Sequence, residues 1–162
     1  MNRKIILPAM FCVVVTLDQI TKFAVKTNMR LYDSVEIIPG LFNIMYVLNP
    51  GAAFGMFGGH SEMFRTIFFI GMTALACIMI LALIIREYRF KVRTFAYTAV
   101  ISGAIGNMLD RLHTGKVVDF LDFYFKNWHW YTFNIADSFI TVGIAVLLLD
   151  FFVFNKGETK NG

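Results

Sequence analysis

Four long apolar stretches constrain what this chain can fold into. They cover about residues 5–25, 63–85, 95–112 and 133–154, and each approaches the roughly 20 residues that an α-helix needs to cross a bilayer core. Charged residues make up only 16% of the chain, whereas soluble domains average about 25%. The sequence therefore predicts an all-α membrane protein, a bundle of four transmembrane helices forming a single integral-membrane domain over residues 1–162.

The longest connection, between the first two stretches, has a different character. Residues 33–55 are too polar to span a membrane, and they are rich in Val, Ile, Phe and Tyr on both sides of Pro39-Gly40. This pattern is typical of short strands around a turn. We expect a small β-rich region here, outside the membrane.

Basic residues indicate the orientation of the chain. Arg86, Arg89, Lys91 and Arg93 crowd one short loop, and the positive-inside rule places such a loop in the cytoplasm. With four spans, both termini are then cytoplasmic as well, and the β-rich region is extracytoplasmic. The basic residues near the two ends agree with this orientation: Arg3, Lys4, Lys156 and Lys160.

Two carboxylates lie among apolar residues, where an ionised group has a high free energy. Asp119 lies in Val117-Val118-Asp119-Phe120, and Asp137 lies near the start of the fourth apolar stretch. An ionisable residue at the edge of a membrane span is a functional-site candidate. Two carboxylates that meet cannot both ionise cheaply, so they can share a proton. This is the chemistry of aspartyl proteolysis.

Other polar residues allow a structural or a functional interpretation. Asp18 and Lys22 have i,i+4 spacing and could form a structural ion pair or support a polar site. Asn107 and Arg111 share a helix face, where they could form an interfacial helix cap or part of a site. The loop of small residues after Asn49 could be a tight turn or could contact a ligand. In the predicted topology all of these residues, and Asn134, fall on the outer side with the two carboxylates. A shared polar site explains why all of these residues lie on the same side better than chance does.

Several classes of function are disfavoured. The net charge of +4 comes from scattered cations without a nucleic-acid motif, so lipid headgroups account for it better. Cys12 and Cys77 lie in apolar runs and predict no disulfide. The histidines are scattered and no HExxH motif occurs, so we expect no metal and no cofactor.

Five motifs in order resemble the bacterial lipoprotein signal peptidases, also called signal peptidase II, over nearly the whole chain. The motifs are Asp18-Gln19-Ile20-Thr21-Lys22, Asn49-Pro50-Gly51-Ala52-Ala53-Phe54, Gly106-Asn107 to Asp110-Arg111, Val117-Val118-Asp119-Phe120, and Phe133-Asn134-Ile135-Ala136-Asp137-Ser138.

The resemblance implies an intramembrane aspartic endopeptidase of the bacterial inner membrane. Such enzymes remove the signal peptide from prolipoproteins, before the diacylglyceryl-modified cysteine, and bind the antibiotic globomycin. Asp119 and Asp137 would be the catalytic residues. The protein would be a monomer in contact with membrane lipid. The substrate- and inhibitor-binding residues would be Asn49, Gly51, Asn107, Arg111 and Asn134. The supporting residues would be Asp18, Lys22, Asp110 and Ala136.

By the same resemblance, residues 119–130 would form a mobile flap over the cleft. Two other classes stay open from the residues alone. One is an ion-coupled carrier, because intramembrane Asp and Lys also mark ion pathways, although the sequence lacks the internal repeats of many transporters. The other is an assembly protein in which the polar groups only pair the helices. Cleavage of a lipidated prolipoprotein would separate the peptidase from both.

Overall fold

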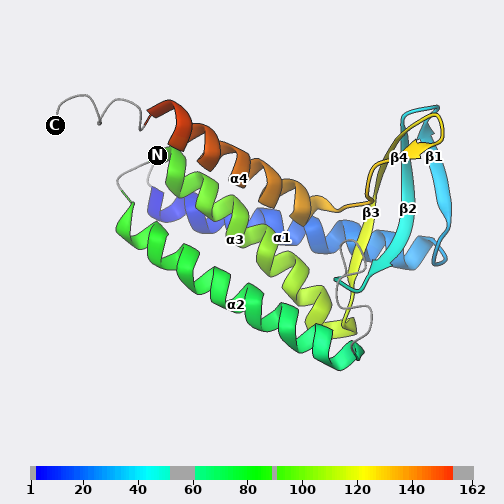
Figure 1. The fold of residues 1–162 in the computed structure, drawn as a ribbon, viewed down its shortest axis with the longest axis horizontal. Coiled ribbons are helices and arrows are strands. Elements are labelled where there is room, and N and C mark those ends of the chain that lie inside the picture. The colour runs from blue at the N-terminus through cyan, green and yellow to red at the C-terminus, as the bar shows by residue number, and fades with distance from the viewer. Residues whose placement is uncertain (1–2, 52–60, 89–90, 155–162) are drawn as a thin grey trace.

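The protein is described by a computed structural model covering residues 3–51, 61–88 and 91–154. Residues 52–55 of the expected β-rich region, and the orientation cations Arg89, Lys156 and Lys160, lie outside the described residues. Four long helices lie side by side, and a sheet stands at one end of them (Figure 1). The chain is mostly helical with a small antiparallel sheet, as predicted.

The helices extend slightly beyond the predicted stretches. They are α1 (Arg3–Asn28), α2 (Glu62–Arg86), α3 (Lys91–Thr114) and α4 (Ile135–Phe154). Among the described residues, α1, α2 and α4 are long and apolar enough to cross a membrane. The third helix carries too many polar residues to meet the same criterion, so a fourth span remains a prediction.

Helix α3 is polar because it occupies the centre of the bundle. It packs against α1, α2 and α4, and buries Thr94, Thr98 and Ser102. The Thr98 hydroxyl donates to the Thr94 carbonyl at 2.8 Å and the Ser102 hydroxyl to the Thr98 carbonyl. These local bonds satisfy buried hydroxyl groups without a partner from another helix.

Small residues allow α3 and α4 to approach closely. A Cβ atom on Gly103 would lie 2.3 Å from the Ala136 carbonyl oxygen, and one on Gly106 would lie 2.7 Å from Asp18 Oδ2. Only glycine fits at these two contacts. The polar C-terminal part of α3 therefore lies directly against α1 and the start of α4.

The sheet contains more strands than the sequence predicted. Its order is β1 (Ser34–Ile38), β2 (Phe42–Asn49), β3 (Val117–Phe125) and β4 (Trp128–His129), all antiparallel. Most of residues 119–130, which we expected to be a loop, is strand paired with β2 or β4, and its role as a flap stays a prediction. Local sequence did not reveal the pairing because β2 lies about 70 residues earlier in the chain.

Strand β3 connects the sheet to the bundle, because it pairs with β2 and also packs against α1. Its residues Val118 and Phe120 are buried with Val25 of α1 in one hydrophobic cluster. Burial of this apolar face fixes the register of β3, and thereby sets the position of Asp119, which lies between the two buried residues in sequence. The fold thus places one predicted site residue on a paired strand at the end of the helices where the sheet stands.

Candidate active site

Asp119 and Asp137 reach the site from different elements. Asp119 lies on β3 opposite Val47 of β2, and Asp137 is the third residue of α4. Asp119 is 2% exposed, and Asp137 is half-buried. Each carboxyl group accepts hydrogen bonds from neighbouring amides, so the two side chains are held in defined orientations.

Asn134 links the two carboxylates. Its Nδ2 atom donates to Asp119 Oδ1 at 2.7 Å, while its Oδ1 atom accepts from the Asp137 backbone N–H at 2.8 Å. The Asp137 carboxylate accepts in turn from the Asn134 backbone N–H at 3.3 Å. This reciprocal arrangement is a capping box at the start of α4. The same residue therefore begins the helix and joins the two acids.

Asn107 of α3 lies behind the pair. Its Nδ2 atom donates to Asp137 Oδ1 at 2.7 Å. Its Oδ1 atom accepts from Lys22 Nζ at 2.9 Å and from Asn134 Nδ2 at 3.1 Å. Asn107 thus connects the buried lysine of α1 with the carboxylate of α4.

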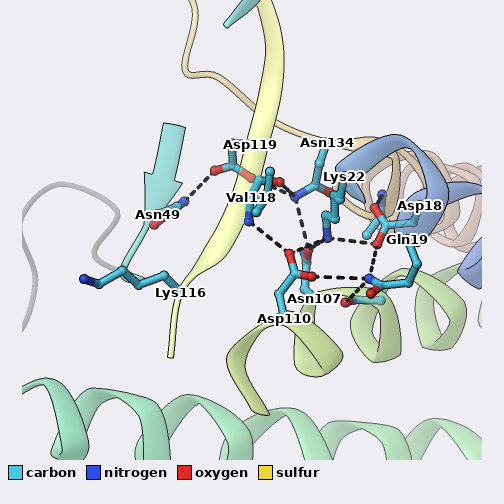
Figure 2. A network of polar contacts seen from close by, with 12 residues as sticks. Asp18, Gln19, Lys22, Asn49, Asn107, Asp110, Lys116, Val118, Asp119 and Asn134 are labelled. Atoms are coloured by element: carbon cyan, nitrogen blue, oxygen red, sulfur yellow. Dashed lines mark hydrogen bonds and ion pairs between the residues drawn. The ribbon is translucent and has the colours of Figure 1, made fainter. Parts of the chain in front are cut away.

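A buried charge cluster supports these amides (Figure 2). Lys22 Nζ lies 2.8 Å from Asp18 Oδ2 and 3.2 Å from Asp110 Oδ2, and its side chain is 1% exposed. Asp18 also accepts from the Ala136 backbone N–H at 2.9 Å, and Asp110 from the Val118 backbone N–H at 3.0 Å. The cluster therefore ties α1 and α3 to the backbone beside both carboxylates.

The end of β2 and the turn that follows it contribute from the opposite side. Asn49 Nδ2 donates to Asp119 Oδ2 at 2.9 Å, and Asn49 Oδ1 accepts from the Gly51 backbone N–H at 2.8 Å. Gly51 adopts a φ of +87°, which favours glycine. The sequence proposed either a tight turn or a ligand contact here, and the structure shows a turn that also holds Asp119.

Electrostatics within the site favour a shared proton. Burial, and then the nearby charge of Asp137, raise the pKa of Asp119 from 3.8 to about 7, although hydrogen bonds from Asn49 and Asn134 oppose the increase. Asp137 lies at the N-terminal end of α4, where the helix dipole stabilises a negative charge. This arrangement suits one protonated and one ionised carboxyl group near neutral pH.

The structure thus brings the predicted site residues into one region. Asp18, Lys22, Asn49, Gly51, Asn107, Asp110, Asn134 and Ala136 connect to the two aspartates through hydrogen bonds and ion pairs. Arg111 differs, because its interactions with Asp137, Asp119 and Asp110 are electrostatic, and its guanidinium lies over the Phe69 ring at 5.2 Å.

Gln19 also contributes to this polar cluster, although its position in the sequence did not indicate a role in the site. Its Nε2 atom lies within hydrogen-bond distance of Asp18 Oδ2, the Gly106 carbonyl and Asp110 Oδ1, at 3.1, 3.1 and 3.4 Å. The available signal was an amide inside an apolar helix, next to an aspartate. Because Gln19 does not share the i,i+4 face of the Asp18–Lys22 pair, spacing alone did not indicate it.

The chain is similar to known proteins over most of its length. Residues 10–153 match the family model described as signal peptidase (SPase) II. The chain is 44% identical over 145 residues to a lipoprotein signal peptidase of Desulforapulum autotrophicum, with 89% of each chain covered. It is 42% identical over 147 residues to that of Geobacter metallireducens, covering 90% of this chain and 89% of the relative.

A solved structure is also similar. It is described as a bacterial membrane enzyme, has 31% sequence identity, and superposes with a TM-score of 0.83 over 96% of this chain and 92% of its own.

Proposed function

This chain belongs to the signal peptidase II family, and from that premise we propose that Asp119 and Asp137 are its catalytic pair. The protein is an aspartic protease that removes signal peptides from prolipoproteins. The family therefore favours a peptidase over an ion-coupled carrier or an assembly protein. The assignment of the pair rests on the contacts of Asn134. Its side chain donates to Asp119 and also caps α4, the helix that carries Asp137.

The proposed reaction uses one proton on the pair. Asp119, with its raised pKa of about 7, holds the proton and donates a hydrogen bond to the scissile carbonyl. Asp137 is ionised and takes a proton from the water that attacks the carbonyl carbon. The tetrahedral oxyanion forms against the Asp119 hydroxyl, and the nitrogen leaves as an amine after accepting the proton held by Asp137.

The amides orient these groups in the proposed mechanism. Asn107 and Asn134 hold Asp137, and Asn49 and Asn134 hold Asp119. Preoriented donors do not need to reorganise during the reaction, which lowers the barrier. We assign substrate and globomycin binding to Asn49, Gly51, Asn107, Arg111 and Asn134, and a supporting role to Asp18, Lys22, Asp110 and Ala136.

The proposed setting is the bacterial inner membrane, with four spans in a single-domain monomer. Both termini would be cytoplasmic, and the sheet would lie at the extracytoplasmic surface. This location suits a lipidated substrate, because the acyl chains can stay in the bilayer while the peptide bond before the modified cysteine meets water. The proposal is supported by the sheet, which stands at one end of the helices (Figure 1), and by Asp119, which lies on its strand β3.

The test is cleavage of a purified prolipoprotein in detergent micelles. We expect cleavage before the diacylglyceryl-modified cysteine, inhibition by globomycin, and much slower cleavage of the same substrate without the lipid. Equal cleavage of both substrates would contradict the proposed role of the lipid. No cleavage of the lipidated substrate by a folded sample would contradict the activity itself.

A further inference from the structure

Arg111 is held in the site by an aromatic ring. Its Cζ atom lies 5.2 Å from the centroid of the Phe69 ring of α2, within the range of a cation–π interaction. Its Nε atom is buried and has no hydrogen-bond partner among the described residues. A buried donor without a partner is costly, so this N–H is suited to an acceptor from a ligand.

The same ring also contacts the loop that holds Asp119. A Cβ atom on Gly51 would lie 2.4 Å from Phe69 Cε2, so the ring packs against the Gly51 backbone. That backbone N–H donates to Asn49 Oδ1, and Asn49 donates to Asp119. The Phe69 ring thus contacts both the guanidinium and the turn behind the aspartate.

We propose that Phe69 is a positioning residue for substrate binding. Its ring holds the Arg111 guanidinium beside the two aspartates, with Nε available to a carbonyl oxygen of the substrate, and it supports the Gly51 turn. Through this ring, α2 controls the position of a substrate-binding cation, although α2 supplies neither aspartate nor any of the amides that contact them. The inference rests on the proposed function, because it assigns Arg111 to the substrate.

The alternative is that Phe69 only fills space, as the other phenylalanines of a membrane helix do. The two possibilities differ in their dependence on the electronic character of the ring. A space-filling role needs the shape of the side chain, whereas a cation–π contact needs the negative face of the aromatic ring. Substitutions that separate shape from ring character therefore distinguish them.

The experiment measures kcat and KM for a lipidated prolipoprotein with purified variants. Phe69→Leu should raise KM by about three- to tenfold, the size of a lost cation–π contact, with a smaller change in kcat. Phe69→Tyr retains the aromatic face and should stay within about twofold of wild type. Phe152→Leu is the matched control, because Phe152 is exposed on α4 and the chemical change is the same.

Two further measurements test whether the ring acts through its charge distribution and through Arg111. Pentafluorophenylalanine at position 69 nearly keeps the shape but reverses the charge distribution of the ring, so it should raise KM as Phe69→Leu does. In an Arg111→Gln background, Phe69→Leu should add little, since residues acting through one interaction are not additive.

Wild-type KM with the fluorinated residue, or full additivity with Arg111→Gln, would overturn the inference while cleavage by wild type continued. If wild type itself did not cleave the substrate, the proposed function would fail instead.

Discussion

Lys22 determines which way the Asn107 side chain points. Lys22 Nζ lies 2.9 Å from Asn107 Oδ1, and a lysine ammonium can only donate hydrogen bonds. The carbonyl end of the amide must therefore face Lys22. The amino end is left to donate to Asp137 Oδ1 at 2.7 Å. A buried cation on α1 thereby orients a donor on α3 toward a proposed catalytic acid on α4.

Removing this cation should destabilise the fold. Lys22→Met would leave Asp18 and Asp110 buried without their shared ion-pair partner, and breaking a buried pair costs about 3–5 kcal/mol. We expect a clear decrease in melting temperature in detergent. Lys26→Met, on the same helix and less buried, is the control and should have little effect. Equal melting temperatures for the two variants would show that the cluster does not stabilise the fold.

Replacing either proposed catalytic aspartate should abolish cleavage. Asp119→Asn and Asp137→Asn should each lower kcat at least about a thousandfold, because asparagine cannot transfer the proton. The double variant should be about as inactive as either single variant, since the residues act as a unit. Rates would be measured with lipidated prolipoprotein, with melting temperature as the folding control. Substantial turnover by either single variant would exclude the proposed pair.

Activity should decline as the pH rises through about 7. The pKa of Asp119 is raised to about 7 by burial and by Asp137, so above this value the shared proton is lost and both acids are ionised. The alkaline limb of kcat/KM should report this loss. Constant kcat/KM from pH 6 to 9 would contradict the assignment of the proton to Asp119.

The same pKa predicts how stability depends on pH. An unfolded Asp119 titrates near 3.8 and the folded one near 7, so the folded state binds more protons between these values. Its contribution to the free energy of unfolding therefore decreases as the pH rises from about 4 to 7. Comparison of wild type with Asp119→Asn should isolate this contribution, because the variant lacks the titrating group. Parallel stability profiles for the two proteins would count against it.

Close packing at Gly103 should be needed for stability. Gly103→Ala would place a methyl group 2.3 Å from the Ala136 carbonyl oxygen, and overpacking costs about 1–3 kcal/mol. Gly71→Ala on α2 is the control, because its added Cβ would meet nothing within 4 Å apart from its chain neighbours and the backbone of its own helix. That control should be neutral, or stabilising by up to about 1 kcal/mol. Thermal unfolding would compare them, and an equally stable Gly103→Ala would show that the two helices can separate.

The proposed orientation can be tested by labelling single cysteines. In a Cys12→Ala, Cys77→Ala background, a membrane-impermeant reagent applied to intact cells should label Lys126→Cys and leave Tyr88→Cys unlabelled. The reason is that basic residues accumulate on the cytoplasmic side, next to Tyr88. Labelling of disrupted cells is the control for access to both positions. The reverse pattern in intact cells would invert the topology.

The sequence alone determined the class of the protein and indicated most residues of its proposed site. Hydrophobic length is a local property, so four apolar stretches predicted α1 to α4 and left only their ends to be corrected. The site residues could also be identified locally, because carboxylates and amides such as Asp137 and Asn134 are conspicuous beside apolar runs. Strands β1 and β2 followed from composition and a Pro-Gly turn for the same reason.

Only the tertiary structure decided how these residues meet. Strand β3 pairs with β2 across a long sequence separation, and no local pattern specifies such a pairing. The roles of Gln19 and Phe69 depend on what lies opposite them: an interhelical polar cluster for the amide, and the Arg111 guanidinium for the ring. The position of Asp119 likewise required the burial of Val118 and Phe120 against α1, because packing between distant segments sets the register of the strand.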